Sequence, residues 1–97
     1  MATIDAGREV RATLDERGKR YGSFREHAKI AQALKWRMEQ TPGWARMTPD
    51  KREALEMIQH KIARILNGDQ EYQDSWHDIA GYAQLIVDIL AQSARRD

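Results

Sequence analysis

The sequence contains no cysteine, only two prolines and no long run of apolar residues. The absence of cysteine excludes disulfides, thiol nucleophiles and zinc sites built on thiolates. No apolar stretch reaches the roughly 20 residues that a membrane-spanning helix needs. The opening residues, MATIDAGREV, also lack the apolar segment of a signal peptide. We therefore expect a cytoplasmic protein with no membrane partner.

An excess of one charge sign is also absent. Charged residues make up 32% of the 97 residues, yet they nearly cancel and leave a net charge of +1. Proteins that coat nucleic acid usually carry a larger excess of cations. We therefore expect no general nucleic-acid binding, and the basic residues matter only where they gather locally.

The remaining pattern predicts four helices in a single all-α domain over residues 1–97. No segment alternates β-branched and polar residues at period two, so no strand is expected. Side chains suited to helix N-caps occur at four places, namely Thr3, Ser23, Thr48 and Ser75. The first three helices are predicted to reach about Arg17, Gln40 and Asn67, and the last has an apolar face that runs to Leu90. At the end of the third helix, Asn67 and Gly68 predict a left-handed C-terminus.

The predicted core is modest, because a chain of this size buries only about 60–65% of its unfolded surface. The third helix supplies an apolar stripe of Leu55, Ile58, Ile62 and Ile65. Further bulky side chains gather around the break TPGWARMTP, namely Trp36, Met38, Trp44 and Met47. We expect a small four-helix bundle completed by homo-oligomerisation, with the second helix or the TPGWARM loop at an interface.

A charged hairpin is the most informative feature of the sequence. Lys61 and Arg64 lie three residues apart on the third helix, and Asp74 and Asp78 lie four apart at the start of the last. Arginine offers a planar fork for carboxylate or phosphate, and lysine offers a compact charge. Either the set is an internal network in which Arg64 pairs with Asp78, or it binds a phosphate-bearing ligand. The candidate ligand-binding residues here are Lys61, Arg64, Asp74, Trp76, Asp78 and Tyr82.

A second basic segment, RGKRYGSFREHAK, spans residues 17–29 and interleaves cations with aromatic residues. Exposed amides at a helix start, close to cations and an aromatic ring, suit a phosphate with an attached base. The alternative is a solvated basic turn. The candidates in this segment are Arg20, Tyr21 and Arg25.

Metal-dependent hydrolysis is a further alternative. Glu53 and Glu56 share the third helix with the hairpin cations, and three carboxylates follow the loop, at Glu71, Asp74 and Asp78. Such oxygen ligands can hold Mg²⁺ and orient a nucleotide's phosphates. Lys61 and Arg64 would repel a cation at the hairpin, so we expect no cofactor and no metal. The histidines, at positions 27, 60 and 77, are too dispersed to predict a zinc site.

Three segments carry a resemblance: RYG near residue 20, KIARILNGD at 61–69 and DSWHDIAGYAQL at 74–85. Together they resemble short phage and prophage proteins of the nucleotide-modification-associated type. Those proteins are similar in outline to all-α nucleotide pyrophosphohydrolases of the MazG and dimeric dUTPase type. The MazG pattern is EExxE followed by ExxD on a later helix. Here Glu53 and Glu56 match part of the first element, but Arg52 stands where the leading glutamate belongs. The resemblance therefore implies a nucleotide-facing architecture more than retained hydrolysis.

These observations lead us to expect a non-enzymatic protein that sequesters a phosphorylated nucleotide. Such short phage proteins also resemble, in size and character, the sponges that sequester immune signals. That analogy implies a cyclic or adenine-derived signalling nucleotide, and a role in countering immunity in an infected or lysogenic bacterial host. One alternative is a MazG-like, Mg²⁺-dependent nucleoside triphosphate pyrophosphohydrolase. Another is a protein-interaction inhibitor of a host enzyme, anchored by Trp36, Trp44 and Met47.

Overall fold

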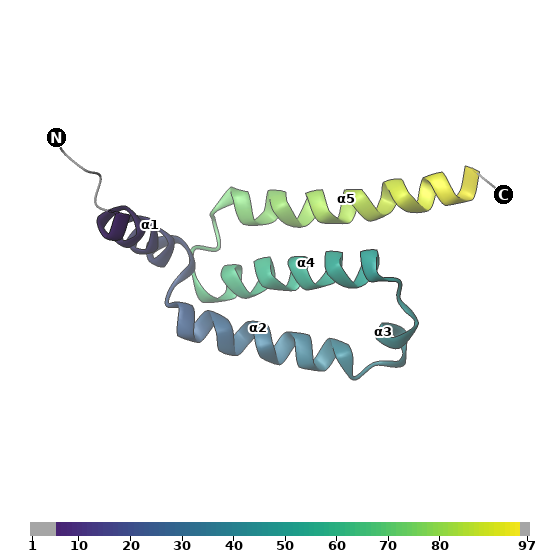
Figure 1. Cartoon of the computed structure of the whole chain (residues 1–97), viewed down its shortest axis with the longest axis horizontal. Helices are drawn as coiled ribbons and strands as arrows, with labels where there is room; N and C mark the ends of the chain where they lie inside the picture. The colour runs from purple at the N-terminus through teal and green to yellow at the C-terminus, as the bar shows by residue number, and fades with distance from the viewer. Residues whose placement is uncertain (1–5, 96–97) are drawn as a thin grey trace.

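The computed structural model describes residues 6–95, and these form an all-α fold without strands (Figure 1). The helices are α1 (Ala6–Tyr21), α2 (Phe24–Glu39), α3 (Pro42–Arg46), α4 (Pro49–Asn67) and α5 (Gln73–Arg95). The predicted all-α class is confirmed. The structure has one helix more than predicted, because the break TPGWARMTP contains the short α3.

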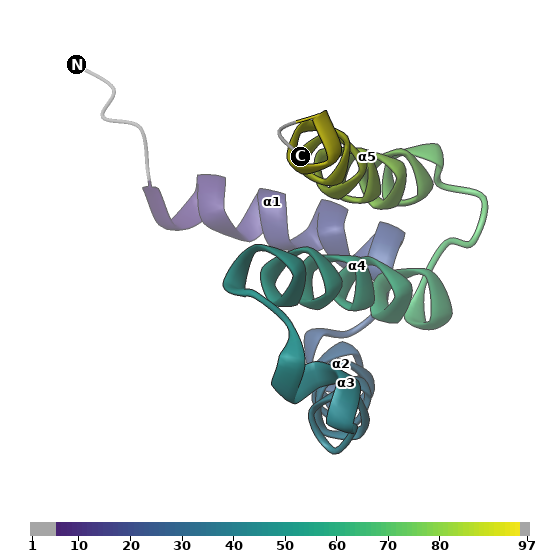
Figure 2. The same cartoon turned by 90° about the vertical axis from the view of Figure 1, so that its right-hand side faces the viewer.

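Three of the helices form a layer one helix thick. In Figure 1, α4 lies between α2 and α5, and α4 packs against both neighbours. Helix α1 crosses one end of this layer and projects to one side of it (Figure 2). The molecule is elongated as a result, with extents of 62 × 32 × 25 Å. Within residues 6–95, no helix combines the length and apolar character that crossing a membrane requires.

The helix starts follow local capping chemistry in two cases. The Ser23 hydroxyl accepts a hydrogen bond of 3.2 Å from the Glu26 amide, which confirms the predicted cap of α2. In α3, the Thr41 hydroxyl accepts a hydrogen bond from the amide of Trp44. Thr48 occupies the predicted N-cap position of α4, but its hydroxyl donates to the Asp50 carboxylate and caps no amide.

Other boundary predictions were wrong. Helix α1 continues through Gly18 to Tyr21, well past Arg17. Helix α5 begins at Gln73, so Ser75 lies inside the first turn and is buried against the rest of the fold. The predicted cap at Thr3 lies outside the described residues.

The turn after α1 and the loop after α4 cross at very close range. A Cβ at Gly68 would overlap the main-chain oxygen of Arg20, and a Cβ at Gly22 would overlap that of Asn67. Gly22 also adopts a positive φ of 76°. The predicted left-handed ending at Asn67 and Gly68 is wrong, because neither residue has a positive φ. Glycine stands at position 68 because the crossing leaves no room for a side chain.

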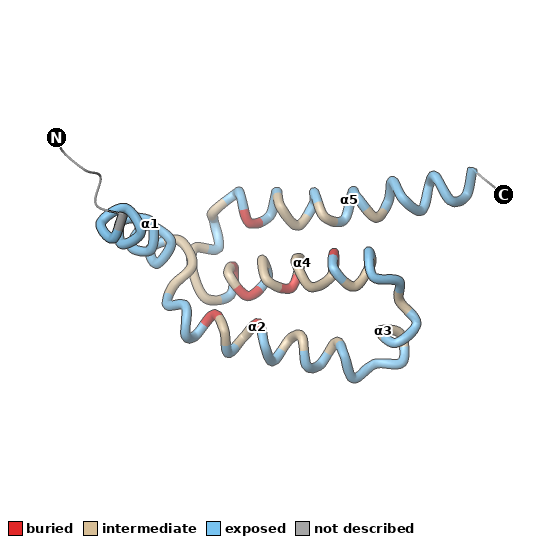
Figure 3. The backbone as a smooth tube through the Cα atoms, viewed as in Figure 1, coloured by how far each residue is buried: buried red, intermediate tan, exposed pale blue. Residues whose placement is uncertain are grey.

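The core is a thin line of small residues along α4 (Figure 3). Among the described residues, no large side chain is fully buried. Of the predicted apolar stripe only Ile65 is buried, whereas Leu55 and Ile58 are half-buried and Ile62 is exposed. The buried apolar residues are Ala31, Ala54, Ala63 and Ile65. Small residues allow α2 and α5 to approach α4 closely, and most of the bulky apolar side chains remain at the surface.

Candidate functional site

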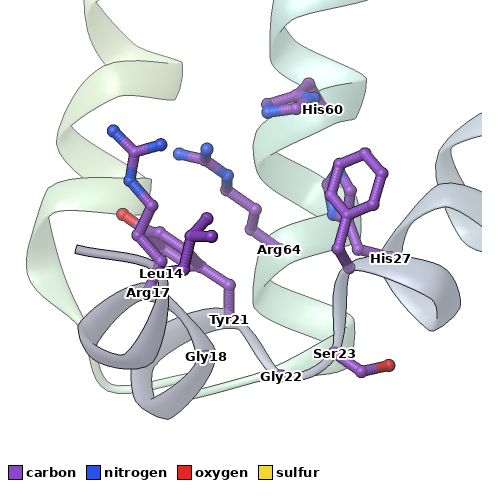
Figure 4. Close-up of a pocket in the computed structure, with 10 residues that line it drawn as sticks. Leu14, Arg17, Gly18, Tyr21, Gly22, Ser23, His27, His60 and Arg64 are labelled. Atoms are coloured by element: carbon purple, nitrogen blue, oxygen red, sulfur yellow. The ribbon is translucent and has the colours of Figure 1, made fainter. Parts of the chain in front are cut away.

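A cavity lies in the angle between α1, the start of α2 and the second half of α4 (Figure 4). Its volume is about 440 Å³, within the roughly 300–1,000 Å³ typical of small-molecule sites. The lining residues are Leu14, Arg17, Gly18, Tyr21, Gly22, Ser23, Phe24, His27, His60 and Arg64. We refer to it as the α1–α4 cavity.

Two arginines bring positive charge into this cavity. The Arg64 guanidinium carbon lies 4.1 Å from the ring centroid of Tyr21, in a cation–π contact. Arg17 lies one turn before Tyr21 on α1, and both guanidinium groups reach the same side of the cavity in Figure 4. In the part of the chain that the structure describes, neither arginine forms an ion pair. Both charges are therefore available to an anion that enters the cavity.

Two histidines from different helices meet in the cavity wall. The rings of His27 on α2 and His60 on α4 are in edge contact, with centroids 4.6 Å apart. Burial, and after it the nearby Arg64 charge, lower the pKa of His60 to about 4. The pKa of His27 is lowered by the same two causes in the same order. Both imidazoles are therefore neutral at pH 7, and each can accept a hydrogen bond.

His27 also carries an unsatisfied polar atom. Its side chain is only 6% exposed, and its Nδ1 has no hydrogen-bond partner within residues 6–95. Buried polar atoms in folded proteins usually have a partner, and those without one need an explanation. Here the atom belongs to a cavity-lining ring but is itself shielded from solvent.

The mouth of the cavity is apolar and lies beside a helix start. Phe24, the first residue of α2, is 80% exposed, and its ring borders the cavity. The first amides of α2 point out of the helix end, where the helix dipole favours negative charge. Cations and an exposed ring thus border one small volume, beside a helix start at which the Ser23 hydroxyl already caps the Glu26 amide.

Of the predicted ligand-binding residues, the α1–α4 cavity brings together only Tyr21 and Arg64. Lys61 points to α5 and not into the α1–α4 cavity. Its Nζ lies 2.9 Å from the Asp78 carboxylate on α5, and its side chain is only 12% exposed. The hydrogen bond from Lys61 lowers the pKa of Asp78. The predicted internal network does form at Asp78, but with Lys61 as the partner in place of Arg64.

Arg20 is engaged at the crossing of the two loops. It pairs with Glu16 at 3.3 Å and with Asp69 at 3.7 Å, and its guanidinium lies over the Tyr72 ring. Tyr72 in turn donates a hydrogen bond of 3.0 Å to the carboxylate of Asp74. Arg20 and Asp74 therefore lie outside the α1–α4 cavity and join α1 to the start of α5.

The three remaining candidates lie on the surface. Arg25 is exposed in the first turn of α2 and does not line the cavity. Trp76 donates from its indole nitrogen to the main-chain oxygen of Gln70 at 3.0 Å. Tyr82 borders a separate shallow hollow on α5.

The sequence analysis did not select Arg17, His27 and His60, which the structure adds to the cavity. A weak signal existed, since Arg17 precedes Tyr21 by four residues and His60 precedes Arg64 by four. Residues four apart share one side of a helix. The sequence analysis did not connect His27 with His60, because 33 positions separate them in the sequence.

The carboxylates of the hydrolase alternative do not converge. Glu53 is exposed on α4, and Glu56 faces Lys35 of α2 at 3.9 Å. Asp78 is held by Lys61. In the described part of the chain, no three histidine or acidic residues lie close enough to hold a metal ion. Among the described residues, Glu53, Glu56 and Asp78 therefore do not come together as the paired carboxylate motif of the hydrolase alternative would require.

Comparison with protein-family models finds one family, described as a domain of unknown function, DUF6378, whose model matches residues 8–90. Among curated proteins and among solved structures, nothing matches the chain.

Proposed function

The chain belongs to the DUF6378 family, and we propose that it binds a phosphorylated, nucleotide-sized ligand in the α1–α4 cavity. One observation carries the proposal: Arg17 and Arg64 line the same cavity, and neither has a carboxylate partner in the described residues. Arginine forks bind phosphate through paired, charge-assisted hydrogen bonds. A phosphate in this position would neutralise both charges.

The other lining groups fit the rest of a nucleotide. The exposed Phe24 ring offers a face on which a base can stack. The neutral rings of His27 and His60 can accept hydrogen bonds from hydroxyl or amino groups of the ligand. Ring and phosphate contacts within one cavity favour a nucleotide over free phosphate.

We further propose sequestration without turnover. The described lining contains no carboxylate, and the acidic residues within 6–95 are engaged elsewhere or exposed. The more specific role, removal of a cyclic or adenine-derived immune signal in a phage-infected bacterium, rests on an analogy of size and character with phage sponge proteins. The family resemblance itself rests on the RYG, KIARILNGD and DSWHDIAGYAQL segments. The first two of these segments meet at the crossing that positions Tyr21 beside the cavity.

Calorimetry with AMP, ATP and cyclic di-AMP, in EDTA and in Mg²⁺, tests this proposal. We expect at least one nucleotide to bind in EDTA, and chromatography to recover it unchanged. Binding should weaken as salt is raised, because counter-ions screen the arginine charges. Failure of the whole panel to bind would refute the proposal. Conversion of ATP to AMP and pyrophosphate in Mg²⁺ would replace it with the hydrolase alternative.

A further inference from the structure

A separate apolar groove lies outside the α1–α4 cavity. This groove runs between α4 and α5, has a volume of about 310 Å³, and is apolar at every lining position except Lys51. The lining residues are Met47, Lys51, Ala54, Leu55, Ile58, Ala83, Ile86 and Leu90. We refer to it as the α4–α5 groove.

The groove faces away from the ligand cavity. Leu55 in the groove and Arg64 in the cavity are nine residues apart on α4. At about 100° per residue they point to opposite sides of the helix. Residues of α1 line the cavity but not the groove, so α1 does not cover the groove.

A single layer of helices leaves apolar faces uncovered, whereas stable domains pack two layers around a core. The radius of gyration is 17.3 Å, against roughly 12.5 Å for a compact chain of this length. Beside the groove, Ile62, Leu66 and Val87 extend the exposed apolar surface along α4 and α5. The helices of the described part of the chain provide no second layer on this side.

The chain has surface to spare for an interface. It exposes 7600 Å², whereas a folded monomer of its mass exposes roughly 5,700 Å². The difference, taken over the whole chain, exceeds the roughly 800 Å² that each partner contributes to a standard protein–protein interface.

We propose that a second copy of the chain covers the α4–α5 groove with its own groove, about a two-fold axis. An apolar, nearly uncharged surface is complementary to itself, which is what a two-fold interface requires. A partner of opposite charge is not indicated, since Lys51 is the only charged lining residue. The half-buried Leu55 and Ile58 would then become core. This places the interface mainly on α4 and α5, and Met47 is the residue of the TPGWARM loop that lines it. The sequence had favoured α2 or that loop.

A matched pair of leucines on α5 tests the proposal. Leu90 lines the groove and is 50% exposed, and Leu85 is 58% exposed beside the hollow that contains Tyr82. Their side chains point about 140° apart around the helix. Light scattering should give twice the 11.3 kDa chain mass for the wild type and for Leu85→Glu. Leu90→Glu should give the chain mass. A wild-type monomer at every concentration, or a dimeric Leu90→Glu, would overturn the proposal.

The reactivity of an introduced cysteine provides a second test, which applies even if Leu90→Glu does not fold. The chain has no cysteine, so one introduced thiol reports one position. Ala83 lines the groove, whereas a Cβ at Gly81 meets open space on α5. At high protein concentration the Ala83→Cys thiol should react with a maleimide at least tenfold more slowly than the Gly81→Cys thiol, and the difference should vanish on dilution. Equal rates at all concentrations would refute the proposed interface.

Discussion

The side-chain amide of Asn67, at the end of α4, donates a 2.8 Å hydrogen bond to the main-chain oxygen of Tyr21, at the end of α1. A second hydrogen bond from the same nitrogen reaches the Ser23 oxygen at 2.9 Å. The amide of Asp69 adds a third link, of 2.6 Å, to the Arg20 oxygen. These contacts hold the turn between α1 and α2 against α4, and so place the Tyr21 ring over Arg64.

Replacing Asn67 should loosen this crossing. In Asn67→Ala, two main-chain oxygens lose their donor, and we expect a loss of roughly 1–2 kcal/mol in the free energy of unfolding. For a domain of this size, that loss corresponds to a fall of about 4–16 °C in melting temperature. Circular dichroism measures it. An unchanged melting temperature would show that the hydrogen bonds do not hold the crossing.

Alanine substitutions at two glycines test the crossing, with Gly22 inside it and Gly81 on α5 as the control. Gly22→Ala forces a side chain into a left-handed conformation and against Asn67, so it should destabilise the fold by more than about 1–2 kcal/mol. Gly81→Ala, within α5 and in open space, should stabilise the fold by roughly 0.5–1 kcal/mol. Thermal melts of the two variants should therefore shift in opposite directions. Equal shifts would contradict the crossing geometry.

The pair of Lys61 and Asp78 should act as scaffold, not as ligand site. Lys61→Met and Asp78→Asn should each lower the melting temperature, and the double variant should lose less than the sum of the two. The pKa of Asp78 is lowered in the fold, so its contribution is present at neutral pH and is lost as the pH falls through that lowered value. Ligand affinity should change little in all three variants. A tenfold loss of affinity in Lys61→Met, with an unchanged melting temperature, would instead return Lys61 to the binding site.

The stability of the fold should also depend on pH through His60, whose pKa is lowered chiefly by burial. The pKa of His60 is about 4 in the fold, against roughly 6.5 in an unfolded chain. Between these values the unfolded state binds more protons, so stability should fall as the pH is lowered from 6.5 towards 4. His60→Gln should flatten the change in melting temperature between pH 7 and pH 5. His77→Gln, exposed on α5, should keep the wild-type dependence. Identical slopes in the two variants would contradict the burial of His60.

The fold was largely predictable because its signals are local. Ser23, Thr48 with Pro49, and Asn67 lie within a few residues of the helix ends they mark. The site was less predictable because it depends on how distant segments cross. Lys61 and Arg64 differ by about 60° around α4. That difference turns Lys61 to α5 and Arg64 to α1. Contacts between distant segments, such as the Asn67–Tyr21 hydrogen bond across 46 residues, hold the helices in these places.

The central claim is that Arg64 binds a ligand phosphate in the α1–α4 cavity. The direct measurement compares the affinities of a nucleotide that binds and of its unphosphorylated nucleoside, for wild type, Arg64→Ala and the control Arg37→Ala. Arg37 is exposed on α2 and does not line the cavity. In wild type and Arg37→Ala the phosphate should improve binding by roughly 10–100-fold. In Arg64→Ala most of that advantage should disappear while the nucleoside affinity stays similar. The same phosphate advantage in all three proteins would contradict the account.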